Sequence, residues 1–252
     1  DLHRLKAATT SLPEQKKIAA FLGVVDAKLT ALRDRVALLE RYKRGLMQAL
    51  FSQSLRFTKP DNSAFPDWEE KRLGDLGKFS GGGTPDTDVE RYWGGQTPWI
   101  SSSDVLDSDL TGALITRWIT DEAIKISATK LVSKGTILIV TRVGVGKLTV
   151  AQCDLCTSQD FTNFLPLSGN ANFIAYWLLE NKNTLLRLCQ GTSIKGLTVQ
   201  DLKAMKLKLP HPDEQRLIAD ALQAMDAKIA AVSDQITKME GFKKGLLQQM
   251  FV

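Results

Sequence analysis

A long segment occurs twice in this chain, at a constant offset of 200 residues. Residues 14–51 align on residues 214–251 without a gap, and 16 of the 38 positions are identical. The identical pairs include Glu14/Glu214, Gln15/Gln215, Ile18/Ile218, Leu22/Leu222, Asp26/Asp226, Lys43/Lys243 and Gly45/Gly245. Two copies this similar are expected to fold alike. Residues 1–12 also align on the residues that end at Pro212, so they are predicted to be the tail of a preceding domain.

Both copies are predicted to be long helices, over residues 13–55 and 213–252. Their apolar residues alternate in steps of three and four, which is the spacing of a coiled-coil seam. The seam residues are Leu22, Val25, Leu29, Leu32, Val36 and Leu39 in the first copy, and Leu222, Met225, Ile229, Val232, Ile236 and Met239 in the second. Each helix would be roughly 55 Å long, too long for one small domain to cover, so a partner helix is expected.

The simplest partner for each helix is the other copy in antiparallel orientation, and parallel association of two chains is the alternative. Lys43 and Lys243 occupy a core position of the seam, and a glycine follows two residues later in both copies. Two interpretations are open. Either the seam splays there and the lysine stem reaches solvent, or the polar core residue determines the register of the pair.

The segment between the repeats is predicted to contain a polar linker, residues 56–64, and a domain of mixed α and β structure, residues 65–212. Strands are expected at residues 136–140, 148–151, 162–166 and 205–209, and a helix at 172–188. The predicted fold class is therefore α+β, a mixed domain flanked by two long coiled-coil-forming helices.

Four glycine-rich loops lie in this domain, at residues 80–85, 93–95, 142–147 and 191–196. Each combines glycine with hydroxyl or cationic side chains. That combination lets main-chain N–H groups and side-chain donors approach phosphates and base edges. For any one loop the alternative is an ordinary turn.

Composition narrows the functional classes. The formal charge of +5 is compatible with a polyanionic partner but is weak support for one. No apolar run approaches the roughly 18 residues of a membrane span.

The odd number of cysteines and the absence of a signal peptide indicate a reducing, cytoplasmic location. Cys153 and Cys156 have the spacing of half a zinc site, without a second pair. A chain that starts at Asp1 rather than Met is expected to have been processed or truncated.

The sequence contains no complete motif of the enzyme classes considered for it. Residues 79–83 fit the F-x-G-x-G pattern of S-adenosylmethionine sites, but no convincing strand precedes them and no Asn-Pro-Pro-aromatic sequence follows. Residues 144–148 lack the first glycine and the Ser or Thr of a P-loop. The two histidines, His3 and His211, lie at the domain edges. The acidic residues Asp104, Asp107, Asp109 and Asp160 form no nuclease pattern. We therefore predict no catalytic residues, no metal and no cofactor.

Several short motifs, in a particular order, resemble the specificity subunits of type I restriction-modification enzymes. They are Phe65-Pro66-x-Trp68, Leu73-Gly74-Asp75, Gly83-Thr84-Pro85, Tyr92-Trp93-Gly94-Gly95, Pro98-Trp99-Ile100, Thr141-Arg142-x-Gly144-x-Gly146-Lys147, Gln159-Asp160, Gly191-Thr192 and Leu209-Pro210-x-x-x-Glu214-Gln215-x-x-Ile218. No single motif is decisive, but their order together with the repeated helices is specific. Ser158 departs from the family, which often has Asn before this glutamine.

The resemblance implies a non-catalytic, cytoplasmic subunit that binds double-stranded DNA. Such subunits have two target-recognition domains, each reading one half of a split DNA site, and two helices that pair antiparallel. The helices set the distance between half-sites and dock two methyltransferase (modification) subunits, to which the restriction and translocase subunits attach. Residues 65–212 would be the second recognition domain and residues 1–12 the end of the first. The chain would then be a fragment, or a half-size subunit that forms a homodimer.

The candidate DNA-binding residues follow from the loops and the resemblance. Lys147 and Lys195 are assigned to the phosphate backbone, and Arg142, Gln159, Ser102, Ser103 and Thr192 to base reading or its support. Thr84 and Ser193 complete the predicted DNA-binding set. Trp93 and Trp99 are predicted to be packing residues. Two other functions stay open: an architectural adaptor that does not bind DNA, and a fragment of an S-adenosylmethionine-dependent DNA methyltransferase.

Overall fold

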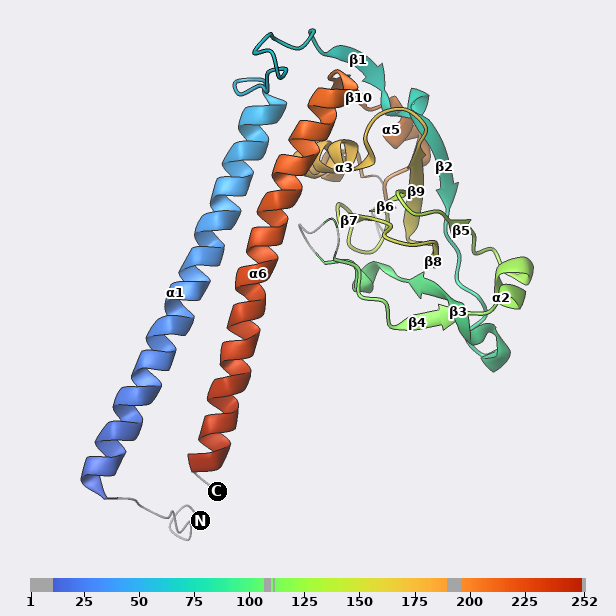
Figure 1. Cartoon of the computed structure of the whole chain (residues 1–252). Coiled ribbons are helices and arrows are strands. Elements are labelled where there is room, and N and C mark those ends of the chain that lie inside the picture. The colour runs from blue at the N-terminus through green and yellow to red at the C-terminus, as the bar shows by residue number, and fades with distance from the viewer. Residues whose placement is uncertain (1–10, 107–109, 111, 190–195, 251–252) are drawn as a thin grey trace. The chain divides into compact units, whose positions relative to one another are not determined.

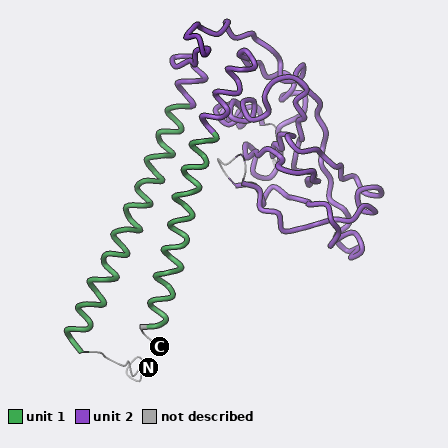
Figure 2. The backbone as a smooth tube through the Cα atoms, in the orientation of Figure 1, with its two compact units in different colours: residues 1–46, 223–252 green, residues 47–222 purple. Residues whose placement is uncertain are grey.

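The computed structural model describes residues 11–106, 110, 112–189 and 196–250. They form two compact units, coloured separately in Figure 2. The helical unit joins the part of the chain up to Leu46 to the part from Gln223 onward. The α/β unit comprises residues 47–222, and the predicted domain at 65–212 lies inside this range.

Two long helices dominate the chain, as the repeat predicts. Helix α1 spans Leu12–Phe51 and helix α6 spans Pro212–Met250. Within the helical unit they run side by side in opposite directions (Figure 1). All twelve predicted seam residues are buried or half-buried, and none is exposed. The predicted antiparallel pairing of the two copies is therefore present in the structure.

Among the described residues three ion pairs link the helices. Arg33 of α1 pairs with Glu240 of α6 at 2.6 Å, and the repeat relates the other two pairs to each other. Lys43 of α1 bonds to Asp226 of α6, and Lys243 of α6 bonds to Asp26 of α1 at 2.5 Å. The Lys43 side chain is only 8% exposed. The interpretation in which this lysine reaches solvent is therefore wrong for Lys43.

The same two pairs favour one register and one orientation. Lysine and aspartate are 17 positions apart in both helices, so the pairs lie about 25 Å apart along the helix axis. A parallel alignment of the two copies would instead place lysine beside lysine and aspartate beside aspartate. Like charges at those positions repel each other, whereas the antiparallel arrangement satisfies both pairs.

The described residues of the α/β unit form ten strands in three sheets, and Figure 1 shows their arrangement. A two-stranded antiparallel sheet joins β1 (Glu69–Arg72) and β10 (Lys206–Leu209). The second sheet has the order β2 (Gly77–Gly81), β9 (Phe161–Pro166), β6 (Ile137–Val140), β7 (Leu148–Val150). The third has the order β4 (Arg117–Ile119), β3 (Trp93–Ile100), β8 (Leu155–Thr157), β5 (Leu131–Val132), with β3 and β8 parallel.

The four predicted strands correspond to β6, β7, β9 and β10, and six others were missed. The missed strands are very short, as are β5 and β8 with two and three residues, or lack a clear apolar pattern. For example, β1 reads Glu-Glu-Lys-Arg and is fully exposed, and β3 contains Gly94, Gly95 and Pro98. Residues of these types are depleted in strands, so pairing with distant segments, not local preference, makes them strands.

The helices of the α/β unit are short. Helix α2 spans Asp121–Ile126 and α5 spans Val199–Ala204. The helix predicted over 172–188 is in fact two, α3 (Ala171–Glu180) and α4 (Lys182–Leu188), separated at Asn181. The Asn170 side chain caps α3 by accepting a hydrogen bond from the Phe173 N–H at 3.0 Å.

The core of the α/β unit lies around β6, whose four residues are all buried. Leu138 and Val140 pack with Ile100, Leu155 and Phe161. Burying side chains of this size contributes about 1.5–3 kcal/mol each. This core holds the strand ends, and the loops that follow them, in fixed positions.

The first turns of α6 are built into the α/β unit. The carboxylate of Glu214 is fully buried and accepts hydrogen bonds from Arg56, at 2.9 and 3.0 Å, and from the Trp68 indole at 3.1 Å. These bonds also raise the pKa of Arg56. The neighbouring Gln215 accepts a bond from the Asn170 N–H and donates one to the Pro210 carbonyl, both at 2.7 Å. A buried carboxylate needs such partners.

Candidate DNA-binding site

A hollow of about 570 Å³ lies where strands β2 and β6 end and β9 begins. Its walls include Gly81, Gly82, Thr141, Arg142, Gln159 and Gly196. Two predicted DNA-binding residues, Arg142 and Gln159, therefore line one surface although they are far apart in the sequence. Both side chains are exposed.

Thr84 joins this group through a hydrogen bond. Its hydroxyl donates to the side-chain oxygen of Gln159. That bond orients the amide so that its nitrogen, a donor, points away from Thr84. Gln159 follows β8, and the preceding Ser158 is tied to β3 by a 2.9 Å bond from its N–H to the Ile100 carbonyl. The amide is thus carried by a segment anchored in the third sheet.

Packing explains part of the glycine-rich sequence before Thr84. A Cβ added to Gly82 would lie 2.1 Å from the Ser158 carbonyl oxygen, and one added to Gly83 would lie 2.5 Å from the Ala128 backbone. These glycines permit close contact between chain segments. Residues 79–81 are part of strand β2 and pair with β9, so the residues that fit the S-adenosylmethionine motif build the sheet.

In the turn between β6 and β7, Arg142 is exposed whereas Lys147 is half-buried. Gly144 and Gly146 have φ values of +91° and +92°, which only glycine adopts without strain. The Lys147 ammonium donates a 3.3 Å hydrogen bond to the Val105 carbonyl. One of its three N–H donors is therefore used inside the α/β unit. The remaining two can serve the predicted phosphate contact.

The two serines at the end of β3 differ in exposure. Ser102 is buried, at 9% exposure, and Ser103 is exposed. Burial makes Ser102 a supporting residue in this conformation, whereas Ser103 faces solvent. Thr192, Ser193 and Lys195 lie outside the described residues.

Sequence reasoning missed a half-buried arginine next to these serines. Arg117 begins β4 and lies directly opposite Trp99 of β3. Its guanidinium carbon is 4.5 Å from the centre of a Trp99 ring, and its Nη2 bonds to Asp104 and Ser101. The register of β3 and β4 creates this contact, and no local pattern in the sequence shows it. Trp99 itself is buried, as predicted.

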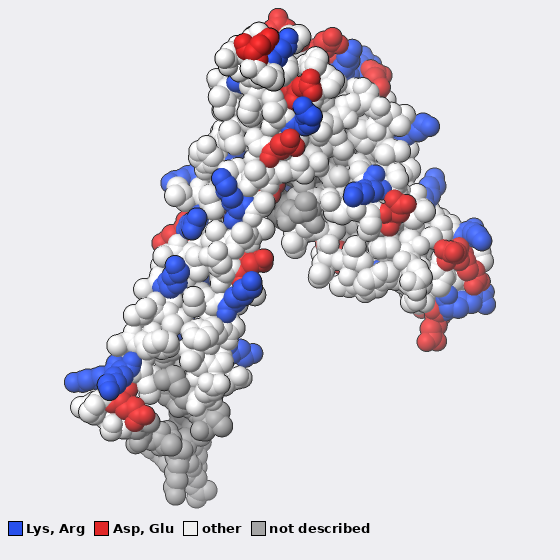
Figure 3. Space-filling model, viewed as in Figure 1, with Lys and Arg blue, Asp and Glu red and all other residues white. Residues whose placement is uncertain are grey.

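Positive charge is unevenly distributed between the two units. The α/β unit, residues 47–222, has 19 Lys and Arg against 20 Asp and Glu, whereas the rest of the chain has 14 against 8. In Figure 3 blue and red side chains are interspersed over the α/β unit. General attraction to phosphates is therefore weak in this unit, and any sequence preference has to come from directed contacts.

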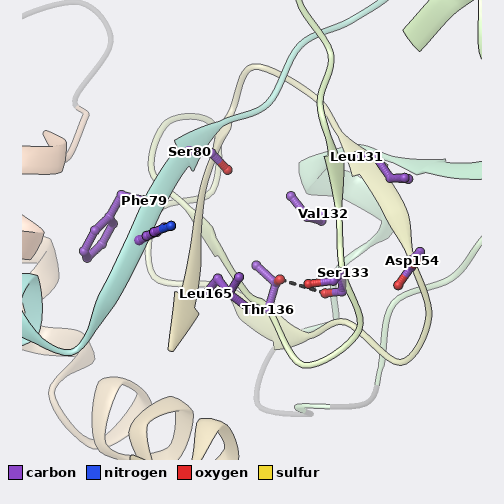
Figure 4. Close-up of a pocket in the computed structure, with 9 residues that line it drawn as sticks. Phe79, Ser80, Leu131, Val132, Ser133, Thr136, Asp154 and Leu165 are labelled. Carbon is purple, nitrogen blue, oxygen red and sulfur yellow. Dashed lines mark hydrogen bonds between the residues drawn. The ribbon is translucent and has the colours of Figure 1, made fainter. Parts of the chain in front are cut away.

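A second, smaller hollow of about 280 Å³ lies beside strand β2 (Figure 4). Lys78, Ser80, Val132, Asp154 and Leu165 are among its lining residues. The Thr136 hydroxyl donates a 2.7 Å hydrogen bond to the Ser133 carbonyl at its wall. No predicted DNA-binding residue lines this hollow, so it is separate from the candidate site.

The described residues offer little for metal chemistry. Among them, no group of three or more His, Cys, Asp and Glu side chains is placed to hold a metal ion. Cys156 is buried in β8, where burial raises the pKa of its thiol. A search of the same part of the chain found no helix long and apolar enough to cross a membrane.

Comparison with known proteins agrees with this architecture. The family model for the type I restriction modification DNA specificity domain matches residues 66–240. The chain belongs to this family. The MjaIX specificity subunit of a type I restriction enzyme from Methanocaldococcus jannaschii is 30% identical over 212 residues, covering 82% of this chain and 49% of that protein.

Solved specificity subunits have a similar fold. The S subunit of a type I restriction-modification system from M. genitalium superposes with a TM-score of 0.66 at 17% identity, covering 96% of this chain and 62% of that chain. The HsdS subunit from Thermoanaerobacter tengcongensis gives 0.56 at 21% identity, covering 95% and 58%. The chain spans about half the length of the curated relatives it matches.

Proposed function

We propose that this chain is a DNA-reading part of a type I restriction-modification complex and performs no chemistry itself. Its α/β unit would read one half of a bipartite DNA target. Its antiparallel helices would set the distance to the other half and dock the modification and restriction subunits. The second recognition domain would come from the rest of a longer chain or from a second copy of this one.

The observation that carries this proposal is the grouping of Arg142, Gln159 and Thr84 around one hollow. A guanidinium, an amide and a hydroxyl are the groups that address base edges in the major groove. They stand on segments fixed by the core, so they can act together. Because the α/β unit has nearly equal numbers of acidic and basic residues, we expect weak binding to non-specific DNA.

The decisive experiment is site-specific methylation by the complex reconstituted with its modification subunits. We expect Arg142→Ala to reduce methylation at the target by about fivefold to a hundredfold, since a lost bidentate base contact costs about 1–3 kcal/mol. Arg72→Ala is the matched control, because Arg72 is exposed on β1 and does not line the hollow. Unchanged methylation by Arg142→Ala would remove this residue from the reading surface.

Salt dependence separates DNA reading from a purely architectural role. Binding to DNA releases counterions, so the affinity of the complex should fall as salt rises. An adaptor that organises proteins alone would show no DNA binding and no such slope. Binding of S-adenosylmethionine by the isolated chain would instead support the methyltransferase interpretation.

A further inference from the structure

Arg117 is a half-buried arginine whose surroundings hold it from two sides. Its guanidinium lies over Trp99, 4.5 Å from the ring centre, where a cation is attracted to the aromatic face. Its Nη2 also bonds to the Asp104 carboxylate and, at 2.8 Å, to the Ser101 hydroxyl. The side chain nevertheless remains 39% exposed.

The groups that hold Arg117 are themselves fixed. Asp104 accepts bonds from the Ser101 N–H at 2.7 Å and the Ser101 hydroxyl at 2.9 Å, in the capping box of a short 3₁₀ helix, Ser102–Asp104. The Trp99 indole donates a 3.0 Å bond to the Gly83 carbonyl, and Trp93 packs edge-on against it at 5.3 Å. These contacts hold Asp104 and Trp99 in place, and the two residues together hold the Arg117 guanidinium in one orientation.

This arrangement belongs to the candidate site. Gly83, which accepts the Trp99 bond, precedes Thr84, and Thr84 bonds to Gln159. The cation–π contact with Trp99, two hydrogen bonds and the Gly83–Thr84 peptide bond thus connect Arg117 to two predicted DNA-binding residues. Nothing in the local sequence around Arg117 indicates this neighbourhood.

We propose that Arg117 reads a guanine in the major groove of the DNA half-site. The bonds to Asp104 and Ser101 use Nη2, so the Nη1 amino group of the guanidinium is the donor that can address both the O6 and N7 acceptors of guanine. An arginine already held in place loses less side-chain entropy on binding. The proposal rests on the proposed DNA-reading function. It adds to that function one specific contact, between Arg117 and a guanine.

The neighbouring carboxylate favours a base over a phosphate as the partner. Asp104 is 12% exposed and offsets much of the arginine charge, which weakens attraction to the phosphate backbone. Directed hydrogen bonds to a neutral base edge do not depend on net charge in the same way. Trp99 and Asp104 would be positioning residues that act through Arg117.

Arg91 is a suitable control because it resembles Arg117 without the fixed supports. It also lies over an aromatic ring, 5.6 Å from the centre of Tyr92, and pairs with Glu122 at 3.1 Å. Its side chain is 69% exposed and that of Glu122 is 45% exposed. Such a surface ion pair is weakly held.

The test is selection from a library of randomised DNA duplexes, followed by sequencing, with the full chain bound to its modification subunits. The wild-type complex should select a motif that includes a G·C pair read by Arg117. In Arg117→Ala and Arg117→Lys, preference at that pair should fall about tenfold to a hundredfold, with the other positions unchanged. Arg117→Lys keeps a cation over Trp99 and guards against a folding defect. Asp104→Asn should weaken the preference at the same pair.

Three results would overturn the inference. Arg117→Ala could keep every base preference, or Arg91→Ala could lose the same preference. A uniform loss of affinity for all sequences, with a shallower salt slope, would make Arg117 a phosphate contact. A wild-type complex that selects no sequence would refute the proposed function, and the inference with it. A wild-type motif that Arg117 variants leave intact would refute the inference alone.

Discussion

Glu14 and Glu214 occupy the same position in the two copies of the repeated helix, yet only Glu214 is buried. Ile218 is 1% exposed and Leu222 fully buried, whereas their counterparts Ile18 and Leu22 are half-buried. The first turns of α6 pack within the α/β unit, whereas no described residue buries Glu14 at the start of α1. Identical residues at matching positions of the two helices therefore differ in burial, and the difference comes from what packs on them.

The partners of Glu214 show how large that difference is. Arg56 comes from the segment after α1 and Trp68 from the segment before β1, and both donate to the same carboxylate. A buried carboxylate is stable only when such donors reach it. Among the described residues the equivalent Glu14 of α1 is exposed, so its carboxylate needs no such donors there. The comparison predicts unequal effects of the same substitution in the two copies.

The largest expected effect is that of Glu214→Ala. It leaves the Arg56 guanidinium without its acceptor, and we expect a loss of about 3 kcal/mol in the free energy of unfolding of the α/β unit. Urea unfolding followed by tryptophan fluorescence measures this, because all five tryptophans lie in residues 47–222. Glu14→Ala, the control, should change stability by less than about 0.5 kcal/mol. Equal losses would contradict the comparison.

A smaller difference is expected from Ile218→Ala and Ile18→Ala. Ile218 is almost fully buried, so truncation should cost about 2–4 kcal/mol through lost burial and the cavity left behind. Ile18 is half-buried, and its truncation should cost about 1 kcal/mol. Paired urea titrations, followed by circular dichroism as well as fluorescence, report both variants. A cost at Ile18 as large as that at Ile218 would show that the start of α1 is also covered in solution.

The stability cost of substituting the lysine should differ less between the two lysine–aspartate pairs. The side chains of Lys43 and Asp226 are 8% and 16% exposed, against 30% and 52% for Lys243 and Asp26. We expect Lys43→Asp to cost about 2 kcal/mol and Lys243→Asp under about 1 kcal/mol, because solvent screens the second pair. Thermal melting at 222 nm is the measurement. Adding Asp226→Lys to Lys43→Asp should restore the melting temperature, and failure to do so would argue against a direct pair.

The smallest effect should be the same in both copies. A Cβ at Gly45 or Gly245 would meet no atom within 4 Å, and neither glycine has a positive φ. Gly45→Ala and Gly245→Ala should therefore each stabilise the helices by about 0.5–1 kcal/mol. Melting of the single and double variants tests this, and destabilisation by either would reveal a contact absent from the structure.

Local patterns were enough to predict the long helices and the buried strands β6, β7 and β9. The seam of α1 and α6 has the three-four periodicity that defines a coiled coil, and β6 and β9 are rich in apolar residues. The exposed strand β1 and the glycine-containing strand β3 have no such pattern. They are strands because β10, β4 and β8 pair with them. The break at Asn181 in the predicted helix likewise had no clear local sign.

The candidate site was predictable only in part. Arg142 and Gln159 could be named from the glycine-rich turn and the family motif, and the structure brings them to one hollow. Three other features of the site could not be predicted from the sequence. They are the hydrogen bond from Lys147 to the Val105 carbonyl, the burial of Ser102, and the contact of Arg117 with the Trp99 ring. Each depends on residues that are far apart in the chain.

By itself, the amino-acid sequence determined that this chain has two matching helices, and it carries the charges that favour their antiparallel pairing. Helical periodicity and the repeat are properties of the sequence alone, so they are visible without a structure. Only the tertiary structure decided which copy of Glu14/Glu214 is buried and which side chains meet around Gln159. Those outcomes depend on strand register and on contacts between distant segments, because burial is a property of the neighbours that surround a residue.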